Sequence, residues 1–142
     1  MLKQIPKNIS PQLIKALMEM GHGDEIVLAD ANYPAASNAK QLIRCDGLGM
    51  PEILASILKL FPLDTYVNAA FCLMDVANSE NFKPEIWETY EKILSDSTGE
   101  NKTIEKLERF EFYERGKKAY VIVATGEEAL YANILLRKGV VK

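Results

Sequence analysis

Helix-like and strand-like hydrophobic patterns alternate along this 142-residue chain, and the alternation limits its fold more than any other feature. Short apolar runs typical of buried strands lie between longer segments whose apolar side chains recur every three or four residues. Chains with this alternation fold into layers, with helices packed against a mostly parallel or mixed sheet. Because the length suits one domain and no repeat or linker is visible, we predict a single α/β domain over residues 1–142.

Helix starts are marked by proline. Ser10 suits an N-cap and Pro11 suits the first helical position, while Gly21 suits the residue after the helix. The segments expected to contain helices are 11–20, 50–61, 84–94 and part of the charged stretch 104–118, with a polar connection over 95–102.

Apolar runs between these segments predict the strands. The expected strands are 25–29, 41–45, part of 66–76, 119–125 and 134–136, with a loop over 32–38. The β-branched and aromatic content of 119–125 predicts a central strand.

Composition excludes several classes of partner. The net charge of -3 and the pI of about 5.3 provide no basic surplus for nucleic acid. No apolar run approaches the roughly 20 residues that span a bilayer, and residues 1–6 do not open a signal peptide. We therefore expect a cytoplasmic protein with no membrane partner, in which Cys45 and Cys72 are buried, reduced thiols.

The chain also lacks the common catalytic motifs. It has no glycine-rich dinucleotide or phosphate loop, no serine-hydrolase elbow and no metal-ligand spacing, so we expect no metal. Its only histidine, His22, lies between glycines just before the strand at 25–29. Histidine exchanges protons near neutral pH, although a surface histidine in a glycine-rich turn is the simpler interpretation.

Four segments, taken together, carry a resemblance. They are Gly21-His-Gly-Asp24, Ala29-Asp-Ala-Asn-Tyr-Pro-Ala35, Glu108-Arg-Phe-Glu-Phe-Tyr-Glu-Arg115 and, after Thr125-Gly-Glu127, Leu130-Tyr-Ala-Asn133. In this order they resemble the family of ribose pyranases and fucose mutarotases over essentially the whole chain. The arginine at 109 and the absence of a second histidine favour the fucose branch of that family.

The resemblance implies a fold, an assembly and a site. The fold is a three-layer α/β/α domain, and the assembly is a homo-oligomeric ring, with ten subunits as the expected number and pockets near subunit contacts. No cofactor is implied. His22 is the expected catalytic residue, and the sugar-binding residues are Asp30, Arg109, Tyr131, Ala132 and Asn133.

The expected reaction is interconversion of the α and β anomers of a free sugar, L-fucose. Opening an aldose ring takes a proton from the anomeric hydroxyl and gives one to the ring oxygen, and one histidine can serve one of these transfers. The group that serves the other is not identified by the sequence. The alternatives are a D-ribose pyranase, acting through the same open aldehyde, and a sugar-binding protein without turnover.

Each binding residue also has a simpler interpretation. Asp30 could only cap backbone amides after its strand. Arg109 could be one more solvated charge, Tyr131 a half-buried aromatic and Asn133 a turn former. Tyr113 is either a core aromatic or a face on which a sugar stacks.

Overall fold

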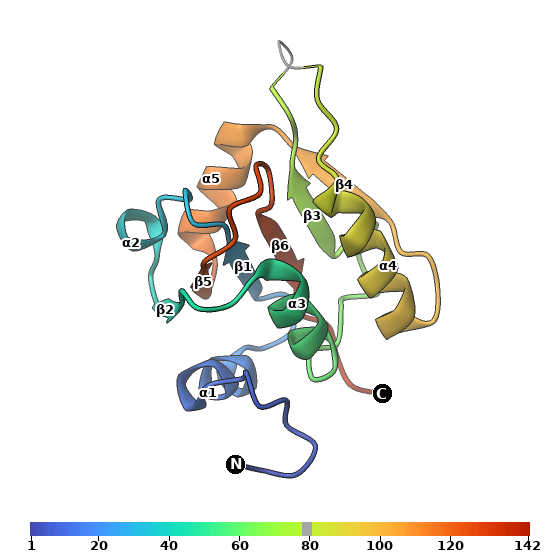
Figure 1. Ribbon diagram of the computed structural model, residues 1–142. Coiled ribbons are helices and arrows are strands. Elements are labelled where there is room, and N and C mark those ends of the chain that lie inside the picture. The colour runs from blue at the N-terminus through green and yellow to red at the C-terminus, as the bar shows by residue number, and fades with distance from the viewer. Residues whose placement is uncertain (78–80) are drawn as a thin grey trace.

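The protein forms a six-stranded mixed sheet in a computed structural model that describes residues 1–77 and 81–142 (Figure 1). The strand order is β2-β5-β1-β6-β3-β4. The strands are β1 (Glu25–Ala29), β2 (Leu42–Cys45), β3 (Phe71–Met74), β4 (Ile104–Leu107), β5 (Val121–Thr125) and β6 (Ile134–Arg137). The helices in the described ranges are α1 (Pro11–Glu19), α2 (Ala35–Asn38), α3 (Met50–Leu58), α4 (Ile86–Thr98) and α5 (Arg109–Lys118).

Strand direction decides which residues can meet. β1 and β2 both pair in parallel with β5, and β3 pairs in parallel with β4. β6 is antiparallel to both β1 and β3. The carboxyl ends of every strand except β6 therefore lie along one edge of the sheet, and the amino end of β6 lies there too.

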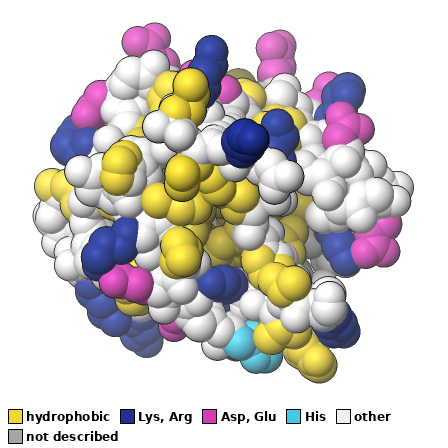
Figure 2. Space-filling view, turned by 90° about the horizontal axis from the view of Figure 1, so that it is seen from below, with side chains coloured by type: hydrophobic (Ala, Val, Ile, Leu, Met, Phe, Trp, Pro, Cys, Tyr) yellow, Lys and Arg dark blue, Asp and Glu magenta, His cyan; other side chains and the backbone are white. Residues whose placement is uncertain are grey.

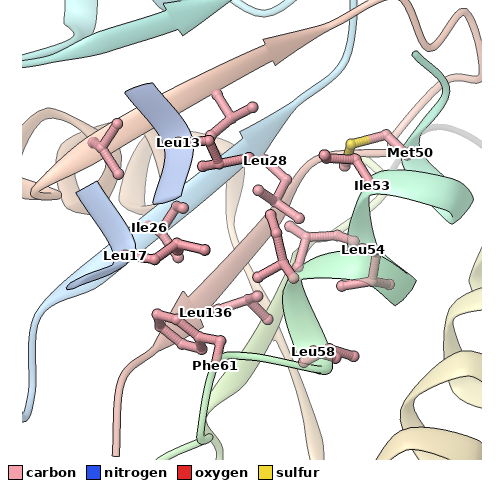
Figure 3. Packing of buried hydrophobic residues seen from close by; sticks show 14 of the residues in the cluster. Leu13, Leu17, Ile26, Leu28, Met50, Ile53, Leu54, Leu58, Phe61 and Leu136 are labelled. Carbon is pink, nitrogen blue, oxygen red and sulfur yellow. The ribbon is translucent and has the colours of Figure 1, made fainter. Parts of the chain in front are cut away.

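Helices cover both faces of the sheet. α1, α3 and α4 pack on one face, where side chains of β1, β5 and β6 join them in a large apolar cluster. Figure 3 shows part of this cluster, in which residues of α1, of α3 and of the loop after α3 pack against β1 and β6: Leu13, Leu17, Ile26, Leu28, Met50, Ile53, Leu54, Leu58, Phe61 and Leu136. On the other face, Phe112 of α5 and Ala35 of α2 pack with Tyr33, Val27 and Ile122. This arrangement confirms the three-layer α/β/α fold.

Local signals placed several elements correctly. The Ser10 hydroxyl accepts a hydrogen bond from the Leu13 amide at 3.1 Å, and Pro11 opens α1 as predicted. At the start of α3 the Glu52 carboxylate accepts a hydrogen bond from the Gly49 amide at 2.9 Å. β1 has the predicted bounds, because its run of apolar side chains is buried on both faces.

Other predicted boundaries were wrong. α4 extends through Thr98 into the predicted polar connection and ends at Gly99, whose φ of 75° is left-handed. Part of the charged stretch 104–118 is helical as predicted, in α5, but the start of that stretch is strand β4, an edge strand with only Leu107 buried. α2 is a single helical turn inside the predicted loop 32–38. Edge strands and single turns bury too little apolar surface to leave a periodic pattern.

Cys45 and Cys72 are both free and buried, as predicted. Burial raises the pKa of the Cys72 thiol to about 11, although the neighbouring Arg115 guanidinium opposes this. Neither thiol therefore has the depressed pKa of a reactive cysteine.

Candidate functional site

The carboxyl edge of the sheet gathers most of the predicted site residues. Asp30 follows the last residue of β1, and Arg109 follows β4 after a single capping residue. Tyr131, Ala132 and Asn133 immediately precede β6, whose amino end meets the same edge. Residues about a hundred positions apart in the chain are thus brought together by sheet topology.

A cavity of about 240 Å³ opens between these segments. Its lining residues are Asp30, Asn32, Tyr33, Met74, Arg109, Tyr113, Leu130, Tyr131 and Asn133. Ligand pockets for drug-sized molecules measure roughly 300–1,000 Å³, so this cavity suits a smaller, polar ligand.

Asp30 and Asn133 form the floor of the site and are both buried. The Asp30 amide donates a hydrogen bond to Asn133 Oδ1 at 2.8 Å, and Asp30 Oδ1 accepts one from the Asn32 amide at 3.0 Å. Burial raises the pKa of the Asp30 carboxyl, while the surrounding N–H groups, led by that of Asn32, oppose the shift. Asp30 therefore caps its turn, as the simpler interpretation held, and also lines the cavity.

The turn at 131–132 is held from α4. Tyr131 has a left-handed φ of 55°, which is uncommon for a residue with a side chain. Trp87 Nε1 donates to the Tyr131 carbonyl at 2.8 Å, and the Tyr90 hydroxyl donates to the Ala132 carbonyl at 2.8 Å. Ala132 is fully buried and is not among the residues that line the cavity, so its contact with a ligand stays a prediction.

Sequence reasoning missed the part played by Trp87 and Tyr90. Both lie in the segment 84–94 that was expected to contain a helix, and both are buried. The available signal was that Trp and Tyr carry a polar atom that must find a partner when the ring is buried. Here the partners are the two carbonyls of the binding turn.

Helix α5 contributes Arg109 and Tyr113. The Glu108 carboxylate caps the helix by accepting from the Phe110 amide at 2.8 Å, which places Arg109 in the first turn beside the cavity. The Arg109 guanidinium lies 4.9 Å from the centre of the exposed Phe110 ring and forms no ion pair within residues 1–77 and 81–142. Tyr113 packs edge-on against Tyr33, with ring centres 5.4 Å apart, and also lines the cavity.

His22 lies at the opposite edge of the sheet. Its loop precedes β1 and is closed by a 2.7 Å hydrogen bond from the Gly21 amide to Asp24 Oδ2. Gly23 adopts a left-handed φ of 87°, and a Cβ atom there would lie 3.2 Å from the Arg137 guanidinium. The imidazole is 45% exposed, its Nε2 lies 3.1 Å from Asp64 Oδ1, and its ring centre lies 5.4 Å from that of Tyr66. Figure 2 shows this imidazole in cyan at the surface, next to hydrophobic side chains.

Strand β1 separates His22 from the cavity. The strand has five residues, and at a rise of about 3.3 Å per residue its first and last Cα atoms are about 13 Å apart. Within one chain the structure therefore brings Asp30, Arg109, Tyr113 and the 131–133 turn together, but it does not bring His22 to them.

The described residues form neither a metal site nor a membrane-spanning helix. No group of three or more His, Cys, Asp or Glu residues in the described ranges is arranged to hold a metal ion. Across the same ranges, no helix combines the length and apolar character needed to cross a membrane.

The fold and the cavity can now be compared with known proteins. The model of the RbsD / FucU transport protein family matches residues 3–141. The chain belongs to this family. It is 54% identical over 144 residues to a mouse fucose mutarotase, covering 97% of this chain and 94% of that protein.

Two solved structures have the same fold. The crystal structure of a fucose mutarotase from Streptococcus pneumoniae in complex with L-fucose is 61% identical, with a TM-score of 0.94, over 99% of this chain and 100% of that one. RbsD from Bacillus subtilis, complexed with D-ribose, is 26% identical, with a TM-score of 0.74, over the whole of both chains. The family resemblance seen in the sequence is thereby confirmed, and the chain is more similar to the fucose-binding structure than to the ribose-binding one.

Proposed function

We propose that this protein interconverts the α and β anomers of L-fucose by opening and re-closing the sugar ring. The observation that carries the proposal is the cavity at the carboxyl edge, where a carboxylate, a guanidinium, an amide and phenols meet. Such groups bind sugar hydroxyls with geometric precision. The similarity to fucose mutarotases over nearly the full chain supports L-fucose as the sugar.

The cavity groups divide between binding and orientation. The Asp30 carboxylate accepts hydrogen bonds from sugar hydroxyls, and the Arg109 fork donates to two sugar oxygens at once. Asn133 is fixed by the Asp30 amide through its Oδ1, and its side chain also hydrogen-bonds to the Asp30 carboxyl, which orients both groups beside the cavity. The Tyr131 side chain closes the other side of the cavity.

The cavity itself has no imidazole. Of its phenols, Tyr33 has its pKa raised to about 12 by burial, which makes it a poor proton donor near neutrality. His22 is the only histidine of the chain, and it lies at the far edge of the sheet with nearly half of its side chain exposed. We therefore assign acid–base catalysis to His22 of the partner subunit, which would complete the cavity in a head-to-tail assembly.

This assignment agrees with the ring expected from the sequence, because a head-to-tail contact presents one edge of each copy to the opposite edge of the next. Ten subunits and a cytoplasmic location stay predictions. Each ring-opening event then needs one proton transfer by the imidazole and a second by water or a cavity group.

The direct test is saturation-transfer NMR at the anomeric protons of L-fucose and D-ribose. Exchange between the α and β signals of L-fucose that greatly exceeds the uncatalysed rate supports the mutarotase. Faster exchange with D-ribose would favour the pyranase, and binding without accelerated exchange would favour a non-catalytic sugar-binding protein.

Subunit complementation tests the shared site. His22→Gln and Arg109→Ala are each expected to be inactive alone, but random co-assembly of the two should restore about a quarter of the sites. Each restored site has its imidazole from one subunit and its cavity from another. If co-expressed variants stay as inactive as the separate ones, His22 and Arg109 act within one chain or His22 does not act at all.

A further inference from the structure

Asp64 is a buried carboxylate placed directly against the proposed catalytic imidazole. Its side chain is 1% exposed, whereas that of His22 is 45% exposed. Oδ1 lies 3.1 Å from His22 Nε2 and also accepts a hydrogen bond from the Tyr66 amide at 2.9 Å. Oδ2 accepts one from Arg137 Nε at 3.0 Å. Both oxygens are thus fixed before any substrate arrives.

The backbone around Asp64 is fixed as well. The Asp64 amide donates to the Arg137 carbonyl at 3.0 Å, and Leu63 forms a bridge to Lys138. Gly139 approaches so closely that a Cβ atom there would lie 2.5 Å from the Leu63 carbonyl oxygen. This packing ties the segment that carries Asp64 to the end of β6, so the carboxylate cannot easily turn away from the imidazole.

The charges around the pair favour an ionised Asp64. The Tyr66 amide, followed by His22 and Arg137, lowers the pKa of the Asp64 carboxyl. Arg137 also faces Glu25, with 3.8 Å between Nη1 and Oε1, and Glu25 is paired in addition with Arg115.

The remaining charged neighbours point elsewhere. The Asp24 carboxylate binds the Gly21 amide, and the Lys142 ammonium lies over the Tyr66 ring. Within residues 1–77 and 81–142, Asp64 is the one carboxylate in hydrogen-bond contact with the imidazole.

We propose that Asp64 is a positioning residue that fixes His22 in the Nε2–H tautomer, so that Nδ1 is the atom that exchanges a proton with the sugar. An ionised carboxylate only accepts hydrogen bonds, so Nε2 must donate. In a neutral imidazole the lone pair is then on Nδ1. The carboxylate also stabilises the imidazolium that forms after proton uptake. This inference rests on the catalytic role proposed for His22.

A purely structural role is the competing explanation, because Asp64 also holds Arg137 and the Tyr66 turn. The tautomer separates the two explanations. Since the chain has a single histidine, ¹⁵N NMR of the imidazole needs no assignment when the protein carries no histidine tag. In the wild-type protein above the imidazolium range, we expect a protonated Nε2 and an unprotonated Nδ1. A predominant Nδ1–H form, or an even mixture of the two, would overturn the proposal without any variant.

The variant Asp64→Asn sharpens the test, because an amide has a similar shape but can also donate to Nε2. We expect the Nε2–H form to lose its dominance and kcat for anomer exchange to fall about 100-fold, at the lower end of what a positioned acid–base group contributes. KM should change much less than kcat, since the cavity residues are untouched. Asp96→Asn, which removes an exposed carboxylate paired with Lys92, is the matched control and should change neither quantity.

The outcomes separate this inference from the proposed function. Full anomer exchange in His22→Gln would remove His22 from the reaction, whatever its tautomer. Loss of exchange in His22→Gln together with wild-type kcat and tautomer in a folded Asp64→Asn would keep the function and reject Asp64 as its positioning residue. If Asp64→Asn does not fold, the wild-type tautomer alone decides.

Discussion

Two buried aspartates lie at opposite edges of the same sheet, and their surroundings differ in kind. Asp30, at the carboxyl edge, has uncharged partners, and burial raises its pKa. Asp64, at the amino edge, has an arginine, an imidazole and a backbone amide as partners, and the Tyr66 amide leads the interactions that lower its pKa. The same residue type thus has opposite pKa shifts, because burial is the largest influence on Asp30, whereas at Asp64 the Tyr66 amide, with His22 and Arg137, outweighs burial.

The two edges differ in what their polar groups can still bind. Around Asp30 the polar groups open onto a cavity, so they can still bind a ligand. Around Asp64 both carboxylate oxygens already have partners, so this carboxylate can act only through the imidazole. In the proposed function, one edge binds the sugar and the other positions the proton carrier, so a complete site would take its two edges from different copies.

The largest expected effect comes from removing the proton carrier. We expect His22→Gln to reduce anomer exchange about 100- to 10,000-fold, the range for a positioned acid–base group. The melting temperature should stay close to that of the wild type, because the imidazole is half-exposed. Saturation-transfer NMR measures the exchange rate and thermal unfolding measures the melting temperature. An unchanged exchange rate would show that no group at the amino edge takes part in the reaction.

The next effect tests the binding edge. Arg109→Lys keeps the charge and loses the planar fork. We expect a loss of about 10- to 100-fold in kcat/KM for L-fucose, since a hydrogen bond to a charged group contributes about 1.5–3 kcal/mol. The preference for L-fucose over D-ribose should narrow as well, as measured by exchange rates of both sugars.

Arg44→Lys is the matched control for this experiment, because Arg44 is exposed and pairs only with Asp46 among the described residues. If Arg109→Lys and Arg44→Lys gave the same exchange rates with L-fucose and D-ribose, Arg109 would be only a solvated charge, as in the simpler interpretation.

A smaller effect is expected from the support of the binding turn. Tyr90→Phe removes the hydroxyl that donates to the Ala132 carbonyl and leaves a buried acceptor without its partner. The expected cost is about 1–3 kcal/mol in the free energy of unfolding. Urea unfolding at one fixed protein concentration measures it, because oligomer stability depends on concentration. A cost near zero would show that water replaces the hydroxyl and that α4 does not hold the turn.

The smallest expected effect is a difference between Asp30 and Asp64 in how each changes the free energy of unfolding with pH. Asp30 has a folded-state pKa above its ordinary value of 3.8, so its charged form costs stability, and this cost disappears as the pH falls through the folded pKa. Asp64 has a folded-state pKa below 3.8, so its contribution is present above that value and is lost as the pH falls through the folded pKa.

Urea unfolding of Asp30→Asn, Asp64→Asn and the wild type between about pH 3 and pH 7 checks both signs. Relative to the wild type, Asp30→Asn should gain stability as the pH rises, and Asp64→Asn should lose it. If the free energy of unfolding changed with pH in the same way in all three proteins, the two edges would not differ electrostatically.

Much of the fold was predictable because its signals are local. The Ser10 cap, the prolines that open α1 and α3, and the apolar run of β1 act within a few residues, and the structure places these elements as predicted. The edge strand β4 was not predictable in the same way. Its Glu105 and Lys106 side chains are exposed, so only its pairing with β3 defines it as a strand.

The candidate site, like the fold, has features that depend on local sequence and features that depend on tertiary contacts. The residue types that can act are already visible in the sequence: one histidine, a strand-ending aspartate, an arginine beside a helix cap and a Tyr-Ala-Asn turn. Only the tertiary structure decided that Asp30 meets Asn133, that Trp87 and Tyr90 hold the binding turn, and that His22 faces Asp64 across the sheet from the cavity. The physical reason is that caps and periodicity depend on neighbours in the chain, whereas these contacts depend on strand order and direction, which are fixed by burial on both faces of the sheet at once.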